Sequence, residues 1–166
     1  MAAIKNLKDL YLDGVKDLYS ACKQAVPVTE ELAAAAKNAD LKQALEASAK
    51  GTRDGMAQME KLAKSHGEDA SGEHCKGMEG LVTEARKHAL EAEFADDDVQ
   101  DAAIIAQYQR LAHYAITGYG TLKAWAKRLD LAEDAKVLDE CTASTYEGDE
   151  DMTKIAVKGG VNKAAL

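Results

Sequence analysis

The stretch VQDAAIIAQYQRLAHYAITGYGTL, residues 99–122, decides the fold that we expect for this chain. Its apolar and small residues recur at alternating steps of three and four residues, which places them along one face of a helix. An unbroken alternation of this kind is typical of a helix that packs lengthwise against partner helices. The pattern continues beyond the stretch and comprises Ile105, Tyr108, Ala112, Ala115, Tyr119, Leu122, Ala126 and Leu129.

The same kind of periodicity divides the rest of the sequence into three more long helices and one short helix. Pro27 is expected to bend or break the first helix, because proline removes a backbone donor and crowds the preceding turn, and Thr29 marks a restart. Asp40 is expected to cap the second helix and Gly67 to end it. The expected long helices cover about residues 4–37, 40–66, 95–129 and 131–157, and the short helix covers about residues 75–93.

The lengths of the connections predict how these helices are joined. Short connections after the first and third long helices indicate two antiparallel hairpins, and the connection of roughly thirty residues between them is long enough to cross the bundle. Two hairpins joined by one crossover form the ferritin-like arrangement. We therefore predict an all-α, ferritin-like up-down four-helix bundle over residues 1–158, with the short helix in the crossover, and a flexible C-terminal tail over residues 159–166.

Composition and charge exclude several classes of function. The 166 residues include 21 basic and 29 acidic side chains, a net charge of −8 that disfavours nucleic-acid binding. No run approaches the ~18–20 apolar residues that span a bilayer, and the charged N-terminal segment has no signal-peptide core. Three cysteines without metal-site spacing indicate reduced thiols. We therefore expect a cytoplasmic protein that binds neither nucleic acid nor membranes.

Small residues occupy the middle of the three clearest helical patterns, whereas large apolar residues occupy the ends. We call these central layers the waist of the bundle. Glycine in a helix and missing methylenes in a core both cost stability, so something must fill this region. Close approach of the helices, inward-leaning tyrosines and methionines, or water would each fill it. The waist residues are Gly14, Ala21, Ser48, Thr52, Gly55, Ala112 and Ala115.

Five segments of the sequence, taken in order, resemble the YciE/YciF family of bacterial ferritin-like proteins. The most distinctive is QDAAIIAQYQRLAHYAITGYGTL, which is similar to the family's RDAALIAAAQ…EHYEIAAYGTL. The resemblance implies a ferritin-like bundle that is usually dimeric and tied to stress responses, with no settled biochemical activity. The other segments are LKDLYLDGVKDLYSACKQ (7–24), LKQALEAS (41–48), CKGMEGLVTEA (75–85) and DEDMTKIA (149–156).

The departures from that family fall where bundles of this kind hold two iron or manganese ions. Such sites need about four inward-facing carboxylates and one or two histidines, because two divalent ions cannot lie together in a low-dielectric interior without anionic ligands. Ligands are missing from all four long helices, so we predict that the metal site is lost. Relative to the family pattern, glutamates are replaced by Cys22, Lys50, Gly51, Ala112, Ala115, Ala143, Ser144 and Thr145, a histidine is replaced by Ser48, a frequent His or Gln is replaced by Gly55, and Glu140 is retained.

The remaining candidate residues have ordinary explanations. His113 follows the inward-facing Ala112 and is expected to face outward. Cys22 and Cys141 could form a thiol pair, or a soft metal site with His113, but small buried thiols are the favoured interpretation. We expect the tyrosines to pack against alanines. The sequence therefore assigns no catalytic, cofactor-binding or metal-binding residue, and we interpret His66, His74 and His88 as ordinary surface or helix-end side chains.

These observations predict a non-catalytic ferritin-like protein with a structural or stress-associated role, forming a homodimer and using no cofactor. One alternative is a di-iron or manganese ferritin-like oxidase with a displaced metal site. The other alternative is a protein that binds a small apolar ligand inside the waist, which requires a cavity larger than a few waters.

Overall fold

The computed structural model describes residues 3–166, and within this range it consists of helices and connecting loops. A 3₁₀ turn at Ala70–Gly72 lies in the crossover, and a π-helical turn at Arg86–Leu90 extends α3. The α-helices are α1 Leu7–Ala35, α2 Ala39–Ser65, α3 Lys76–Ala85, α4 Asp97–Arg128, α5 Ala132–Val157 and α6 Val161–Ala164.

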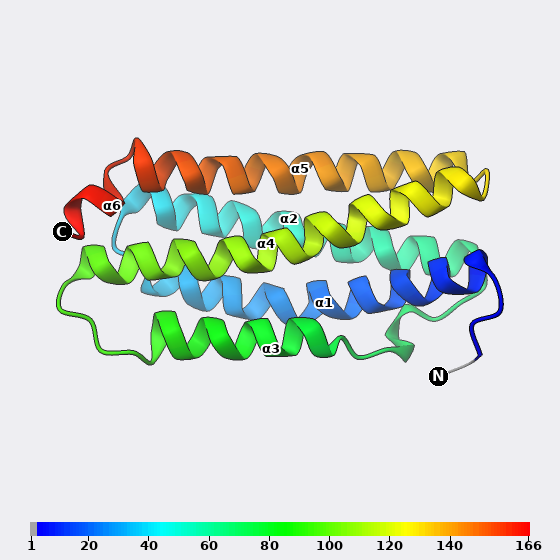
Figure 1. The fold of residues 1–166 in the computed structure, drawn as a ribbon, viewed down its shortest axis with the longest axis horizontal. Helices are drawn as coiled ribbons and strands as arrows, with labels where there is room; N and C mark the ends of the chain where they lie inside the picture. Colours follow the sequence, from blue (N-terminus) through cyan, green and yellow to red (C-terminus); the bar gives the residue numbers. More distant parts are fainter. Residues whose placement is uncertain (1–2) are drawn as a thin grey trace.

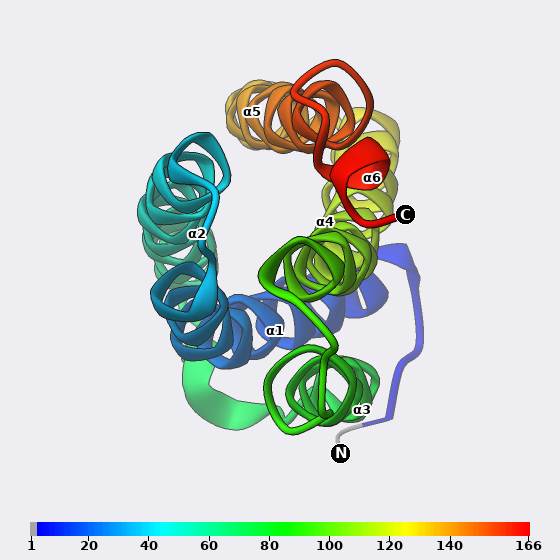
Figure 2. The same ribbon diagram turned by 90° about the vertical axis from the view of Figure 1, so that its left-hand side faces the viewer.

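Four long helices form the bundle, and Figure 1 shows them running side by side along its length. Helices α1 and α2 form one hairpin, and α4 and α5 form the other. The end-on view in Figure 2 places α3 outside the ring of four, against α1 and α4. The predicted all-helical bundle of two hairpins, with a long crossover that carries a short extra helix, is confirmed.

The residue that caps the N-terminus of α2 differs from the prediction, whereas the residue that ends α2 does not. The side-chain oxygen of Asn38 accepts a hydrogen bond from the Leu41 backbone N–H at 3.1 Å, so Asn38 caps α2. The prediction of Asp40 as the cap was wrong, because Asn38 lies three residues before that N–H and Asp40 lies within the first turn. Gly67 has a φ of 76° just after α2, and its expected role in ending the helix is confirmed.

Of the predicted bend or break at Pro27, the break does not occur, and α1 continues through Pro27 and Thr29 to Ala35. Pro27 lies on the exposed side of the helix, where water can satisfy the carbonyl group that proline leaves without a donor. On the opposite side, Val28 and Thr29 are fully packed, with 0% and 1% of their surfaces exposed. Packing of this buried face therefore holds the helix together across the proline.

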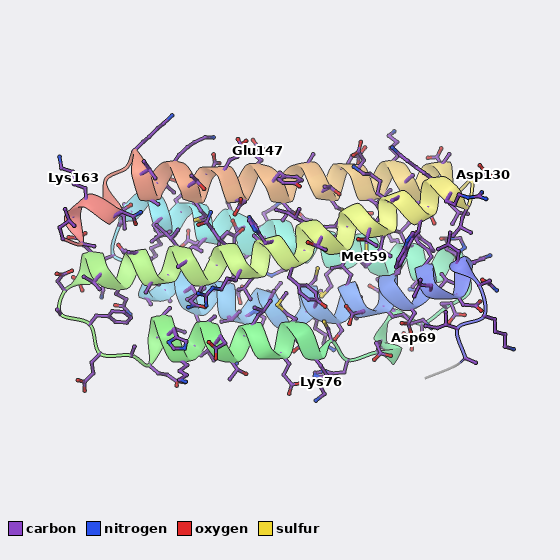
Figure 3. The ribbon with its side chains drawn as sticks, viewed as in Figure 1. Met59, Asp69, Lys76, Asp130, Glu147 and Lys163 are labelled. Carbon is purple, nitrogen blue, oxygen red and sulfur yellow. The ribbon has the colours of Figure 1, made fainter. Side chains whose placement is uncertain are left out.

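The predicted inward-facing residues form the core. Tyr108, Tyr119, Leu122 and Ala126 of α4 are all buried, as the heptad pattern requires. Met59 of α2, labelled in Figure 3, is fully buried inside the bundle. The three-and-four periodicity of the sequence thus identified the packing faces of the long helices correctly.

Residues 159–166, expected to form a tail, contain the short helix α6. Its Val161 is 1% exposed, and α6 lies against α4 and α5. The mobility that we expected of this segment stays a prediction. Among the described residues, no helix combines the length and the apolar character that crossing a membrane requires.

Candidate functional site

A cavity of ≈ 390 Å³ lies at the waist, between the four long helices. Its wall includes Cys22 from α1, Gly51 from α2, Ala112 and Ala115 from α4, and Ser144 from α5. The sequence analysis identified these positions as ones where other residues replace metal-binding acids. The small side chains therefore leave space at the centre of the bundle that the surrounding tyrosines and methionines do not fill.

Two glycines of α2, one turn apart, show where this space is filled and where it is open. A Cβ atom added at Gly55 would overlap the hydroxyl group of Tyr119, so this tyrosine occupies the volume beside α2. A Cβ atom added at Gly51 would have nothing within 4 Å. Gly51 and Ser144 are both exposed although both line the cavity, so the cavity opens to solvent between α2 and α5.

The thiols in the cavity wall are held in their neutral form. Cys22 is 3% exposed, and its Sγ lies 3.3 Å from the Tyr119 hydroxyl. Burial raises the pKa of Cys22 to about 11 and also raises the pKa of Tyr119. Burial likewise raises the pKa of Cys141 to about 11. Because the thiolate is the reactive form, both cysteines are poor nucleophiles near neutral pH.

Three threonines of the wall present hydrogen-bond acceptors to the cavity. The hydroxyl groups of Thr29, Thr52 and Thr145 each donate to the carbonyl oxygen four residues earlier, at 2.8, 2.9 and 2.8 Å. Each hydroxyl has one hydrogen, and that hydrogen is committed to the helix. Only the oxygen lone pairs of these side chains are left for a molecule in the cavity.

The opening between α2 and α5, which we call the mouth, is acidic. Asp54, Glu140, Glu147 and Asp151 line it, and no Lys, Arg or His of residues 3–166 does so. Two of these acids have partners outside the lining, since Lys50 lies 3.1 Å from Asp54 and Lys154 lies 2.7 Å from Asp151. The remaining two, Glu140 and Glu147, form no ion pair within the described chain; Figure 3 labels Glu147 on α5.

His113 lies outside the cavity, as predicted. Its side chain is 65% exposed, and its Nε2 lies 3.0 Å from the Asp149 carboxylate on α5. The neighbouring Ala112 is 5% exposed and lines the cavity. His113 therefore cannot complete a site with Cys22 and Cys141 in this arrangement. Within residues 3–166, His, Cys, Asp and Glu side chains form no group of three or more that could hold a metal ion.

Two partly buried polar clusters were missed by the sequence analysis. At one end of the bundle, Asp134 of α5 lies 2.7 Å from His66 Nε2 and accepts a hydrogen bond of 2.9 Å from the Tyr11 hydroxyl. His66, interpreted as an ordinary helix-end residue, therefore joins α2 to α1 and α5. No local pattern connects these three residues, which are far apart in sequence, so no signal in the sequence could have paired them.

The second cluster fixes the crossover to the bundle. Cys75, which precedes α3, lies 2.9 Å from the Tyr114 hydroxyl of α4, and Asp17 of α1 accepts from that hydroxyl at 3.1 Å. The ring of Tyr114 lies against Gly77, where an added Cβ would come within 2.9 Å of it. Through these contacts of Cys75 and Tyr114, α3 is held against α1 and α4.

Comparison with known proteins places the chain in a family. The model of a domain of unknown function, DUF892, matches residues 6–166. The Escherichia coli protein YciF is 32% identical over 163 residues, covering 98% of this chain and 96% of YciF.

Two solved structures share the fold. YcfI from Rhodopseudomonas palustris, described as a candidate structural protein, matches with a TM-score of 0.86 and 32% identity over 93% of this chain and 97% of its own. The E. coli stress protein YciF matches with a TM-score of 0.86 and 31% identity, over 93% of this chain and 96% of its own. The sequence motifs, the family match and the fold agree, and the chain therefore belongs to this YciF-type family, DUF892.

Proposed function

We propose that this chain is a non-catalytic member of its family with a structural or stress-associated role, and that it lacks the dinuclear metal site of ferritin-like bundles. The observation that carries the proposal is the chemistry of the cavity wall. Where a metal pair would need carboxylates, the wall presents Cys22, Gly51, Ala112, Ala115 and Ser144. The names of two relatives, a stress protein and a candidate structural protein, support the assigned role.

Electrostatics also supports the proposal that the waist lacks a dinuclear metal site. Two divalent cations need several anionic ligands to offset the cost of leaving water. The inner wall offers two thiols whose pKa is raised to about 11 by burial, so they are protonated near neutral pH. The acids Glu140 and Glu147 lie at the exposed mouth of the cavity and not among the buried side chains.

Elemental analysis tests the proposal directly. The protein is purified from medium supplemented with iron and manganese, and the bound metal is measured per chain after dialysis. We expect well below one equivalent of either metal. One or more tightly bound equivalents would contradict the proposal and favour an iron or manganese oxidase with a displaced site.

Restoring the acids gives a second test. Cys22→Glu, Gly51→Glu, Ala112→Glu, Ala115→Glu and Ser144→Glu, combined in one variant, place carboxylates around the cavity. Like charges that share a low-dielectric space repel, so the metal-free variant is expected to unfold at a lower temperature than the parent chain. Added manganese is expected to recover part of that loss. If manganese leaves the melting temperature of the variant unchanged, these five positions do not surround a common site.

We also propose that the chain is a homodimer, which is what the family resemblance implies, and that it is cytoplasmic, which its three cysteines without metal-site spacing favour. The exposed face of the α1–α2 hairpin is the surface that we assign to the dimer contact. Sedimentation equilibrium measures the mass directly, and a mass that stays at that of one chain, 17.8 kDa, up to high micromolar concentration would contradict the dimer.

A second candidate function is the binding of a small molecule inside the waist. The observation that favours it is the ≈ 390 Å³ cavity, which falls in the size range of small-molecule pockets, about 300–1,000 Å³. Ligand-induced shifts in the melting temperature test this function, because a molecule that binds only the folded state raises its stability. A panel of small apolar probes that never shifts the melting temperature would count against it.

A further inference from the structure

We propose that the waist cavity binds a small organic cation, an amine carried on a short apolar body, with its ammonium group held at the mouth. This inference rests on the second candidate function, because it names the class of ligand for the same cavity. Three separate properties of the cavity support it: its apolar interior, the charge at its mouth and the hydrogen-bonding character of its wall.

The interior of the cavity suits an apolar body. Leu18, Met78 and Leu111 are buried side chains of the wall, and alanines of α1 and α4 cover much of the remainder. Removing apolar surface from water favours binding in proportion to the area buried. The interior therefore provides affinity for a hydrocarbon chain or ring, without selecting the charge of the group attached to it.

The mouth selects a positive charge. Four carboxylates line it, and none of the residues of the described chain that line the cavity is basic. Lys50 and Lys154, the partners of Asp54 and Asp151, are 78% and 54% exposed, so these ion pairs are weak and leave negative potential at the mouth. Glu140 and Glu147 contribute full charges without an ion-pair partner among residues 3–166. A bound carboxylate would be repelled here, whereas an ammonium group would be attracted.

Three threonines of the wall favour a hydrogen-bond donor, although Ser48, Ser144 and Gln58 also line the cavity and can both donate and accept. Thr29, Thr52 and Thr145 have already given their hydroxyl hydrogens to carbonyl groups of their own helices. Each can only accept a further hydrogen bond, and an ammonium group is a donor with three hydrogens and no acceptor. The acceptor character of these three threonines is separate from the charges at the mouth, and it favours the same class of ligand. An alkylamine also keeps its charge near neutral pH, as the lysine side chain does.

A matched series of probes tests this proposal on the full chain. 3-Phenylpropylamine, 3-phenylpropanol and 4-phenylbutyrate share one phenylpropyl body and differ in the charge of the head group. Isothermal titration calorimetry at low ionic strength measures the three dissociation constants. We expect the amine to bind roughly tenfold more tightly than the butyrate, with the alcohol between them, and we expect this spread to shrink in high salt because the mouth is exposed.

Two variants show where the probes bind. The double variant Glu140→Gln/Glu147→Gln is expected to remove most of the preference for the amine and to leave the affinity for the alcohol unchanged. Its matched control, Glu133→Gln/Glu150→Gln, makes the same charge change on exposed α5 positions outside the cavity lining and is expected to keep the preference. Gly51→Trp fills open space at the mouth and is expected to weaken all three probes.

The possible results separate this proposal from the function on which it rests. Equal affinities for the three probes, or an amine preference that survives in the Glu140→Gln/Glu147→Gln variant, would overturn the cationic ligand and leave the cavity a binding site. If no probe binds at millimolar concentration, both the cationic ligand and small-molecule binding in the waist are overturned. If Gly51→Trp changes the sedimentation mass while the probes still bind normally, the mouth is a contact between chains and the proposal fails.

Discussion

The paired substitutions Gly51→Ala and Gly55→Ala test the geometry of the waist. Both glycines lie inside α2, one turn apart, and neither has a positive φ, so alanine fits the backbone at both positions. In a helix interior, alanine is more favourable than glycine by about 0.8–1 kcal/mol. A Cβ at Gly51 meets nothing within 4 Å, so Gly51→Ala should show this full gain. For a chain of this size, that gain raises the melting temperature by roughly 2–4 °C.

Gly55→Ala should have the opposite effect. The new methyl group would overlap the hydroxyl of Tyr119, which is 3% exposed and cannot move freely. Overpacking a core costs about 1–3 kcal/mol, and moving this hydroxyl from Cys22 removes a contact worth about 1 kcal/mol. After the propensity gain is subtracted, Gly55→Ala should destabilise the protein by about 1–3 kcal/mol. The two variants should therefore differ by about 2–4 kcal/mol.

Urea unfolding followed by circular dichroism at 222 nm measures both free energies of unfolding. Gly80→Ala on α3 is the matched control, because that glycine also has nothing within 4 Å of an added Cβ. It should show a gain similar to that of Gly51→Ala. If Gly55→Ala is as stable as Gly51→Ala, then Tyr119 does not lie against α2. If Gly51→Ala is destabilising while Gly80→Ala is not, the mouth of the cavity is closed.

Three further predictions concern buried polar groups. Asp101→Ala should destabilise the protein by about 2–3 kcal/mol in urea unfolding. Asp101 is 1% exposed and accepts hydrogen bonds from the backbone N–H groups of Lys37 and Asn38 at 2.9 and 2.7 Å. The control variant Asp98→Ala removes an acid without such contacts and should cost well under about 1 kcal/mol. Asp134→Ala should cost about 1–3 kcal/mol, and Tyr11→Phe should cost less because it leaves the contact between Asp134 and His66 in place. The pKa of Cys22 is about 11 in the folded state, against an ordinary value of 9.0. The stabilisation that comes from this difference is complete below pH 9 and is lost as the pH rises from 9 to 11. The free energy of unfolding should fall by up to about 3 kcal/mol over that range. A Cys22→Ala variant should lose less stability over that pH range, and an equal loss in the two proteins would contradict the assignment.

Periodicity was sufficient to predict the fold because the information about the packing faces is local. Each inward-facing position of α4 follows from the steps between neighbouring residues, and the buried positions Tyr108, Ala112 and Tyr119 match them. The waist could be predicted in the same way, since small residues at the middle of three helices must meet. The direction in which the resulting cavity opens depends on how far α2 lies from α5, and this spacing is set by the tertiary packing of the whole bundle.

Side-chain partners over long sequence distances could not be predicted. Asp101 follows three other acids at the start of α4, where a negative charge is favourable, and nothing local in the sequence distinguishes it from them. In the structure it accepts two backbone hydrogen bonds from the loop between α1 and α2, and so ties the two hairpins together. Tertiary packing also explains why α1 does not break at Pro27, because burial of Val28 and Thr29 outweighs the loss of one backbone hydrogen bond.

The size of the cavity shows why its opening matters for function. An empty, closed cavity costs about 24 cal/mol per Å³, so ≈ 390 Å³ would cost about 9 kcal/mol, as much as the whole stability of a typical domain. The bundle avoids this cost because Gly51 and Ser144 leave the cavity open to water and the threonine oxygens can accept hydrogen bonds from that water. Water that enters through the mouth can leave through it when a better-fitting molecule arrives. The exchange of this water for an apolar body is the source of binding free energy that both ligand experiments measure.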